Sequence, residues 1–147
     1  MKHLVLALLC GGVLAGGAAC DDRAPAGAPG SASGAAAAAI PEVTVDELNH
    51  LLARAAGTPV DANGPVTRGS KGVIPGAIRL SDYETFSARE LPADKAHPLV
   101  FYCANEQCGA SHAAAEKARK LGHRDVRVLP AGIMGWVAAG KSVEPGA

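Results

Sequence analysis

The spacing of apolar residues predicts three helices in this chain. The first, over residues 44–57, begins with a threonine three positions before Glu47, which is the spacing of a capping box, and continues with leucines at helical intervals. The second covers residues 110–122, where alanines recur on one stripe and a glycine ends the pattern. A shorter helix covers residues 131–140 and carries Trp136. These helical segments alternate with apolar runs of a different kind.

The apolar runs are short and typical of β-strands. PLVFYC, at residues 98–103, is continuously apolar, as in a strand that is buried on both faces of a parallel sheet. Gly-Pro and Pro-Gly signals mark residues 63–77 as a loop, and residues 82–97 suit a helical turn or two followed by a connection. Strands that alternate with helices predict an α/β fold, with a mainly parallel central sheet flanked by helices. Shorter runs predict three further strands at residues 58–61, 77–81 and 125–130.

The N-terminal part of the chain predicts export rather than a packed core. Residues 1–20 have the layout of a signal peptide, with a basic start, an apolar stretch too short to span a membrane, and small residues before Cys20. Small residues before a cysteine also resemble a lipobox, in which the cysteine is acylated, although Gly17 stands where leucine is usual. Residues 21–39 are almost entirely Ala, Gly, Pro and Ser, which predicts a linker.

These segments predict a folded domain over residues 40–147 that faces the periplasm. In the favoured interpretation a lipid on Cys20 anchors it, and the membrane is contacted only through that lipid. The alternative is a soluble periplasmic or secreted protein whose Cys20 is incidental. In either case Cys103 and Cys108 are the thiols left in the domain, in a compartment where disulfides can persist.

Charge and composition argue against nucleic acid as a partner. The formal net charge is zero, with 14 basic and 14 acidic side chains, so no electrostatic attraction to a polyanion or an anionic membrane surface is expected. The chain holds one Trp, two Tyr and two Phe, which is too few for a base-stacking platform.

The candidate chemistry lies where the buried strand meets the second helix. Cys103 ends the strand, and in parallel sheets ligands bind outside the carboxyl ends of the strands. A thiol is a nucleophile as its thiolate, and a helix N-terminus can lower its pKa. We expect the loop that runs from Cys103 to Cys108 to turn backbone N–H groups toward the sulfur. The same groups would hold an anion or the terminal sulfur of a persulfide.

The order of these segments resembles that of the single-domain rhodaneses, a family of sulfurtransferases, over residues 43–141. PVDAN is similar to the family's early strand with its aspartate, TRGSKGVIPGAIRL to its Gly-His-Ile-Pro-Gly-Ala segment, and LVFYC to the strand before its catalytic cysteine. ASHAAAEKARKLGH is similar to the helix after that cysteine, and DVRVLPAGIMGWVAAGK to the closing strand, turn and helix.

The resemblance implies a rhodanese-like fold and a persulfide on Cys103. Sulfur would pass from a small sulfane donor such as thiosulfate to a thiol acceptor, and no cofactor would be needed. The resemblance also implies an active-site loop that holds the transferred sulfur, made of Ala104, Asn105, Glu106, Gln107, Cys108 and Gly109.

The chain departs from the family pattern at several positions. The family loop often carries arginine near its start and arginine or threonine at its end, whereas this loop has Ala104, Glu106 and Cys108, and Glu106 is its only charge. Val73 replaces the histidine of the Gly-His-Ile-Pro-Gly motif, and Asn63 replaces a common arginine. These changes weaken the case for efficient turnover of thiosulfate. Phosphatases with a related Cys-x5-Arg loop need an arginine six residues after the cysteine to clamp phosphate oxygens. That position is Gly109, so phosphate-ester hydrolysis is rejected.

The roles of the remaining candidates stay open. Cys108 is a resolving thiol for a Cys103 persulfide or sulfenic acid, a structural disulfide partner, or a small loop residue. Asp61 is expected to anchor N–H groups, and Arg68 either supplies a positive charge or is a solvated surface residue. The cysteines and histidines do not reproduce a zinc spacing, so no metal is expected. The alternatives to a sulfurtransferase are a thiol–disulfide redox module that uses the two cysteines and a non-catalytic interaction module.

Overall fold

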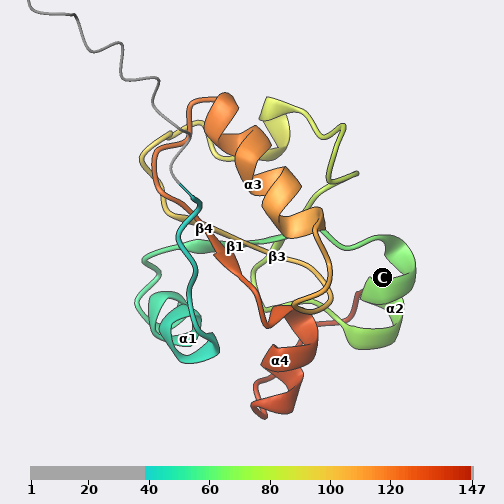
Figure 1. Cartoon of the computed structure of the whole chain (residues 1–147). Helices are drawn as coiled ribbons and strands as arrows, with labels where there is room; N and C mark the ends of the chain where they lie inside the picture. The colour runs from blue at the N-terminus through green and yellow to red at the C-terminus, as the bar shows by residue number, and fades with distance from the viewer. Residues whose placement is uncertain (1–38, 147) are drawn as a thin grey trace, which may run out of the picture. The chain divides into compact units, whose positions relative to one another are not determined.

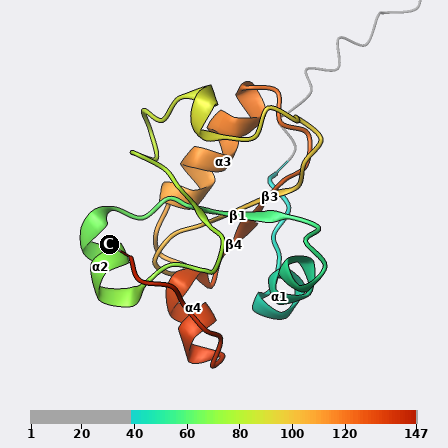
Figure 2. The ribbon, with the colours of Figure 1, turned by 180° about the vertical axis from the view of Figure 1, so that it is seen from behind.

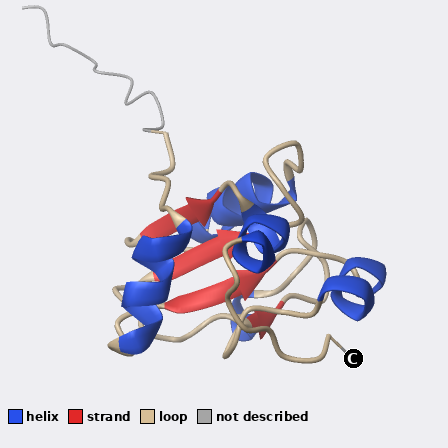
Figure 3. Ribbon diagram, turned by 90° about the horizontal axis from the view of Figure 1, so that it is seen from below, coloured by secondary structure: helices blue, strands red, loops and turns tan. Residues whose placement is uncertain are grey.

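The computed structural model describes residues 39–146. The predicted signal at residues 1–20, with Cys20, and residues 21–38 of the predicted linker lie outside the described part. The domain is built on a four-stranded sheet in the order β2-β1-β3-β4, with every neighbouring pair parallel (Figure 3). The predicted α/β fold with a parallel sheet flanked by helices is confirmed. The strands are β1 (Thr58–Asp61), β2 (Ile78–Arg79), β3 (Leu99–Tyr102) and β4 (Val126–Leu129).

Helices cover both faces of this sheet, with α3 on one face and α1 and α4 on the other (Figures 1 and 2). The alternation of side chains along β3 explains why two faces need covering. Phe101 points into the apolar cluster under α3, whereas Val100 and Tyr102 point into the cluster under α1 and α4. The helices are α1 (Val45–Ala53), α2 (Pro65–Lys71), α3 (Ala110–Lys120) and α4 (Gly132–Ala138), with a 3-10 turn η1 (Ala88–Glu90).

The start of α1 forms as its sequence predicts. The Thr44 hydroxyl accepts a hydrogen bond of 3.2 Å from the backbone N–H of Glu47, and the Glu47 carboxylate accepts one of 2.7 Å from the backbone N–H of Thr44. This capping box satisfies two N–H groups that have no partner inside the helix. Leu48 then points into the core, where it is fully buried.

One prediction of local structure was wrong. Residues 63–77 were expected to form a loop, and they contain α2. Pro65 stands in its first turn, where a missing N–H costs nothing, and Gly72 ends it with φ +77°. None of its residues is buried, so the segment carries no apolar stripe that could reveal a helix.

The C-terminal tail returns to the end of α2, and the two lie side by side (Figures 1 and 2). The backbone N–H of Val73 donates to the Glu144 carbonyl at 3.0 Å, and the Glu144 N–H donates back at 2.9 Å. Val73 is fully buried under this contact. No helix between residues 39 and 146 is long and apolar enough to cross a membrane.

Candidate active site

Cys103 leaves the central strand β3 at the edge where all the strands end. Asp61 at the end of β1 lies opposite Tyr102 of β3, which in turn lies opposite Leu129 of β4, so the next residue of β3 emerges between its neighbours. The Cys103 side chain turns toward α3 and is only 1% exposed. The predicted nucleophile is therefore buried at the carboxyl edge of the sheet, beneath its own loop.

The Cys103 sulfur is surrounded mainly by oxygen atoms. It lies 2.9 Å from the carbonyl oxygen of Cys108, 3.3 Å from the hydroxyl oxygen of Ser111 and 3.8 Å from the carbonyl oxygen of Asn105. A carbonyl oxygen can only accept, so these contacts favour the protonated thiol of Cys103 over its thiolate. Both cysteines are free thiols.

The two thiols differ in acidity. Burial raises the pKa of Cys103, and a hydrogen bond with the Cys108 side chain raises it further, against a smaller opposing effect of Ser111. Partial burial also raises the pKa of Cys108, but hydrogen bonds from the Cys103 thiol and from the N–H groups of Ala104 and Ala110 outweigh it. The pKa of Cys108 therefore lies below that of an ordinary thiol, and its thiolate is the one the loop favours.

Helix α3 supplies the amides around these sulfurs. It begins after Gly109 with no side-chain cap, so its first N–H groups are available to other partners. The Ser111 N–H contacts the Cys103 sulfur and the Ala110 N–H contacts the Cys108 sulfur. The helix N-terminus thus divides its donors between the two thiols.

Helix α4 holds the first part of the loop from the other side. The Ile133 N–H donates to the Cys103 carbonyl at 2.8 Å, and the Met134 N–H donates to the Ala104 carbonyl at 3.0 Å. Gly132 adopts φ +59°, and a Cβ on it would lie 2.5 Å from the Cys103 carbonyl oxygen. Only a glycine lets α4 approach the loop this closely.

An open hollow of about 370 Å³ lies between the loop and α4. The residues that line it from the loop are polar. Those that line it from α4 are apolar and mostly small, and Met134 among them is 47% exposed. Among the described residues, Glu106 forms no ion pair. The approach to the thiols therefore combines an apolar floor with one uncompensated negative charge. The lining residues are Asn105, Glu106, Gln107, Ala131, Met134, Gly135 and Ala138.

Asp61 and Arg68 lie at the same edge of the sheet but are bonded to each other. The buried Asp61 carboxylate accepts hydrogen bonds from the N–H of Asn63 at 2.7 Å and from the Arg68 guanidinium at 3.2 Å. Arg68 also donates to the carbonyl oxygens of Asp61 and Leu80. The guanidinium thus connects β1 to the segment after β2. Its hydrogen bonds in the described part of the chain go to Asp61 and Leu80, and none goes to either cysteine.

Tyr102 completes this buried network on the face opposite Cys103. Burial raises the pKa of its phenol well above the usual range, and the neighbouring Asp61 carboxylate raises it further. The phenol stays protonated, hydrogen-bonds to Asp61, and accepts a hydrogen bond of 3.0 Å from the Ile74 N–H. The network fixes the strand end from which Cys103 emerges.

Sequence reasoning missed Ser111 and the N-terminus of α4. A signal for Ser111 was present, because it lies on the same helical stripe as the buried residues Ala114 and Ala118 and is itself 2% exposed. A polar residue on such a stripe, in the first turn of the helix that follows the strand, is a candidate partner for the side chain just after the strand. Nothing local in the sequence marked Ile133 and Met134 as donors to the loop.

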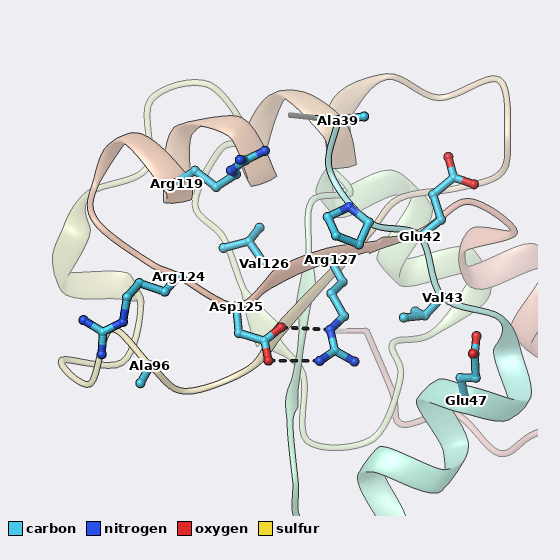
Figure 4. Close-up of a pocket in the computed structure, with 11 residues that line it drawn as sticks. Ala39, Glu42, Val43, Glu47, Ala96, Arg119, Arg124, Asp125, Val126 and Arg127 are labelled. Carbon is cyan, nitrogen blue, oxygen red and sulfur yellow. Dashed lines mark hydrogen bonds and ion pairs between the residues drawn. The ribbon is translucent and has the colours of Figure 1, made fainter. Parts of the chain in front are cut away.

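A larger hollow, of about 690 Å³, lies at the opposite end of the sheet (Figure 4). It is lined by Val126, the first residue of β4, and by Asp125 and Arg127, which form a bidentate ion pair in which Arg127 Nε lies 2.8 Å from Asp125 Oδ1. Since Cys103 follows the last residue of β3, this hollow is no part of the thiol site. No group of three or more His, Cys, Asp or Glu side chains within residues 39–146 is arranged to hold a metal ion.

A buried cysteine at the carboxyl edge of a parallel sheet, a short loop with a second thiol, and a helix that begins directly after it define a class of α/β proteins with a cysteine-loop site. The family model of the rhodanese-like domain matches residues 44–139 of this chain. The chain belongs to the rhodanese-like domain family.

Solved structures agree with this assignment. A human single-domain sulfurtransferase, TSTD1, is 27% identical with a TM-score of 0.52, over 67% of this chain and 96% of that one. A Rhodopseudomonas palustris protein described as a possible tyrosine phosphatase is 25% identical with a TM-score of 0.59, over 71% and 85% of the two chains. A rhodanese-related protein of Thermoplasma volcanium shares the fold at 23% identity, with a TM-score of 0.57 over 69% and 95%. No curated protein matches the chain.

Proposed function

We propose that this rhodanese-like domain is a sulfurtransferase whose nucleophile is Cys103. The observation that carries the proposal is the place of Cys103, at the end of β3 and at the N-terminus of α3, with a backbone N–H of the helix on its sulfur. A persulfide formed there extends into a loop whose amides can hold its charge.

The reaction needs only the chain and its two substrates. The Cys103 thiolate attacks the outer sulfur of a sulfane donor, a sulfur–sulfur bond forms, and the remainder of the donor leaves, which is sulfite when the donor is thiosulfate. An acceptor thiolate then attacks the outer sulfur of the persulfide and restores the Cys103 thiolate. Because burial raises the pKa of Cys103, loading should accelerate as the pH rises above neutrality.

The charges around the loop favour a donor that is less anionic than thiosulfate. The loop has no basic side chain, Glu106 is unpaired at its rim among the described residues, and Arg68 is held by Asp61 and the Leu80 carbonyl. A doubly charged donor therefore meets repulsion without compensation. We expect weak binding of thiosulfate and better binding of a singly charged thiosulfonate or a hydropersulfide.

Phosphatase activity, the description attached to the Rhodopseudomonas palustris relative, is not supported here. The position that would carry the phosphate-clamping arginine is Gly109, which is the residue before α3. Phosphate-ester hydrolysis in this loop would lack a cation for the charge that develops in the transition state.

An assay of sulfur transfer to cyanide tests the proposal. With thiosulfate or a thiosulfonate as donor, the unsubstituted chain should form thiocyanate over many turnovers, and Cys103→Ser should form none. Cys20→Ser, which changes a cysteine outside the domain, is the matched control and should retain the activity. An active Cys103→Ser variant, or an unsubstituted chain that transfers no sulfur from any of these donors, would refute the proposal.

We also propose that the domain works outside the cytoplasm, tethered through a lipid on Cys20. The support is the sequence of residues 1–20 and the linker that follows. The intact mass of the mature protein tests it: an acylated N-terminal cysteine is expected, and an unmodified mature chain would contradict the tether.

A further inference from the structure

We propose that Cys108 is a second reactive residue, which attacks the Cys103 persulfide, closes a disulfide with Cys103 and releases sulfide. The domain would then convert a sulfane sulfur to sulfide with its own two thiols as the reductant. This inference rests on the proposed function, because it starts from the Cys103 persulfide.

The first argument is proximity. The Cys103 sulfur lies 2.9 Å from the backbone oxygen of Cys108, and the two side chains are close enough for each to shift the pKa of the other. The loop between them is fixed at its start by α4, through the Met134 N–H on the Ala104 carbonyl, and at its end by α3. Two groups held next to each other react as if each were present at a high concentration. A free thiol in solution lacks this advantage unless it first binds at the site.

The second argument is access. Cys103 is 1% exposed, whereas Cys108 is half-buried at the rim of the loop. An external thiol must displace the loop to reach a persulfide at Cys103. Cys108 already lies inside that barrier and needs only a rearrangement of its own loop.

The third argument is the arrangement of hydrogen-bond donors. The N–H groups of Ala104 and Ala110 hydrogen-bond to the Cys108 sulfur and lower the pKa of Cys108, and both donors remain when Cys103 carries a persulfide in place of its thiol. The Cys103 sulfur instead faces two carbonyl oxygens and the Ser111 hydroxyl. The loop thus favours a thiolate at Cys108, which is the form that attacks a sulfur–sulfur bond.

The step balances without an external oxidant. The Cys108 thiolate attacks the inner sulfur of the persulfide, which is Cys103 Sγ, and a bond between the two cysteine sulfurs forms. The bond from Cys103 Sγ to the outer sulfur breaks, and that sulfur leaves with the electron pair and takes up the proton that Cys108 lost when it ionised, which gives hydrosulfide. The sulfane sulfur is reduced to sulfide while the two cysteines are oxidised to a disulfide. An external dithiol reductant resets the site by thiol–disulfide exchange.

The experiment follows one round of reaction in the full chain. The protein is reduced, freed of reductant without oxygen, and mixed with excess thiosulfate or a thiosulfonate in the absence of any acceptor thiol. Sulfide is measured in solution. Trypsin cuts after Lys95 and Lys117, so residues 96–117 form one peptide that contains both cysteines, and its mass reports their state.

The expected result has three parts. The unsubstituted chain releases one sulfide per protein and stops, its peptide loses two hydrogens, and a dithiol restores further release. Cys108→Ser releases no sulfide, and its peptide gains one sulfur atom on Cys103. Cys20→Ser behaves like the unsubstituted chain, and protein without donor stays reduced.

Two results overturn the inference, and they differ from a failure of the proposed function. If the unsubstituted chain keeps a stable extra sulfur on either cysteine and releases no sulfide, the inference is wrong while the sulfurtransferase function stands. If sulfide appears without the disulfide in the 96–117 peptide, the inference is also wrong, and this readout needs no variant. If neither the unsubstituted chain nor Cys108→Ser takes up sulfur, the proposed function itself fails.

Discussion

At the scale of single residues, the cysteine at the end of the strand is not the cysteine whose thiolate the loop favours. Cys103 occupies the strand end, but carbonyl oxygens surround its thiol, and these favour the protonated form. Cys108 has no strand to hold it, but two backbone amides and the neighbouring thiol favour its thiolate. In the proposed reaction, the donor therefore meets at Cys103 a thiol whose neighbour Cys108 has the lower pKa.

Reversing the loop's only charge should change donor preference. We expect Glu106→Arg to raise kcat/KM for thiosulfate about fivefold, because it replaces repulsion of the anion by attraction, and the gain should shrink as salt is added. Steady-state assays with thiosulfate and with a singly charged thiosulfonate measure the difference between donors.

The control for this prediction is Glu116→Arg, an equal change of charge on the exposed surface of α3. It should alter thiosulfate turnover much less. An equal gain from both variants would mean that net charge, rather than the position of Glu106, controls the reaction.

What the sequence predicts at this scale ends where side chains meet across elements. The placement of Cys103 follows from an apolar run that ends before a helix, and both features are local. The hydrogen bonds of Arg68 with Asp61 and the Leu80 carbonyl are not local, because they join residues up to 12 positions apart. The contact of Ser111 with Cys103 likewise depends on the packing of α3 on β3.

At the scale of elements, the loop is shaped by two helices that arrive from different directions. Helix α3 continues the chain after the loop, whereas α4 comes from beyond β4 and presents its first N–H groups to the carbonyls of Cys103 and Ala104. Those carbonyls are then unable to turn toward the Cys103 sulfur as acceptors. Helix α4 therefore orients the loop as well as covering the sheet.

The close approach of α4 gives a prediction with a built-in comparison. Gly132→Ala should lower the free energy of unfolding by about 3 kcal/mol, because its backbone has positive φ and the new Cβ would overlap the Cys103 and Ala104 carbonyls. Gly140→Ala, at φ +70° with nothing within 4 Å of the new Cβ, should lose about 1 kcal/mol.

Urea denaturation measures both variants, and sulfur loading of each folded variant separates shape from stability. Gly132→Ala should also load Cys103 more slowly, since the loop must shift to make room. Equal losses of stability in the two variants would show that positive φ, rather than contact with the loop, accounts for the effect.

Elements with a strong local pattern were predicted well. The capping box of α1, the buried run of β3 and the alanine stripe of α3 all appear where the sequence places them. Helix α2 was missed because none of its residues is buried in the apolar core, and it is held by Pro65 at its start and by the returning C-terminal tail. That tail's pairing with Val73 joins segments about 70 residues apart, which no local pattern encodes.

At the scale of the whole molecule, stability should depend on pH through one buried histidine. His123 is 3% exposed, its Nε2 lies 2.9 Å from Lys95 Nζ, and its Nδ1 has no partner among the described residues. Burial lowers the pKa of His123, and the Lys95 ammonium lowers it further. The folded state therefore resists a proton that the unfolded chain accepts.

The sign of the effect follows from proton linkage. As the pH falls below about 6.5, the ordinary histidine pKa, the unfolded chain binds the proton and the folded chain does not, so the free energy of unfolding decreases. Urea denaturation from about pH 7.5 to about pH 5.5 measures the loss. His123→Asn should flatten it, whereas His50→Asn, on the exposed side of α1, should not. An unchanged slope in His123→Asn would assign the dependence to other groups.

The segment before α1 has a consequence for how the protein meets its partners. Pro41 and Val43 hydrogen-bond to Val128 along the outer side of β4, and Ala39 lines the hollow beside Val126. The chain thus enters the domain at the end of the sheet where β4 begins, while Cys103 emerges where β3 ends. The entry of the chain and the thiols therefore lie at opposite ends of the sheet. A donor or acceptor that approaches the thiols does not meet the segment through which the chain enters the domain.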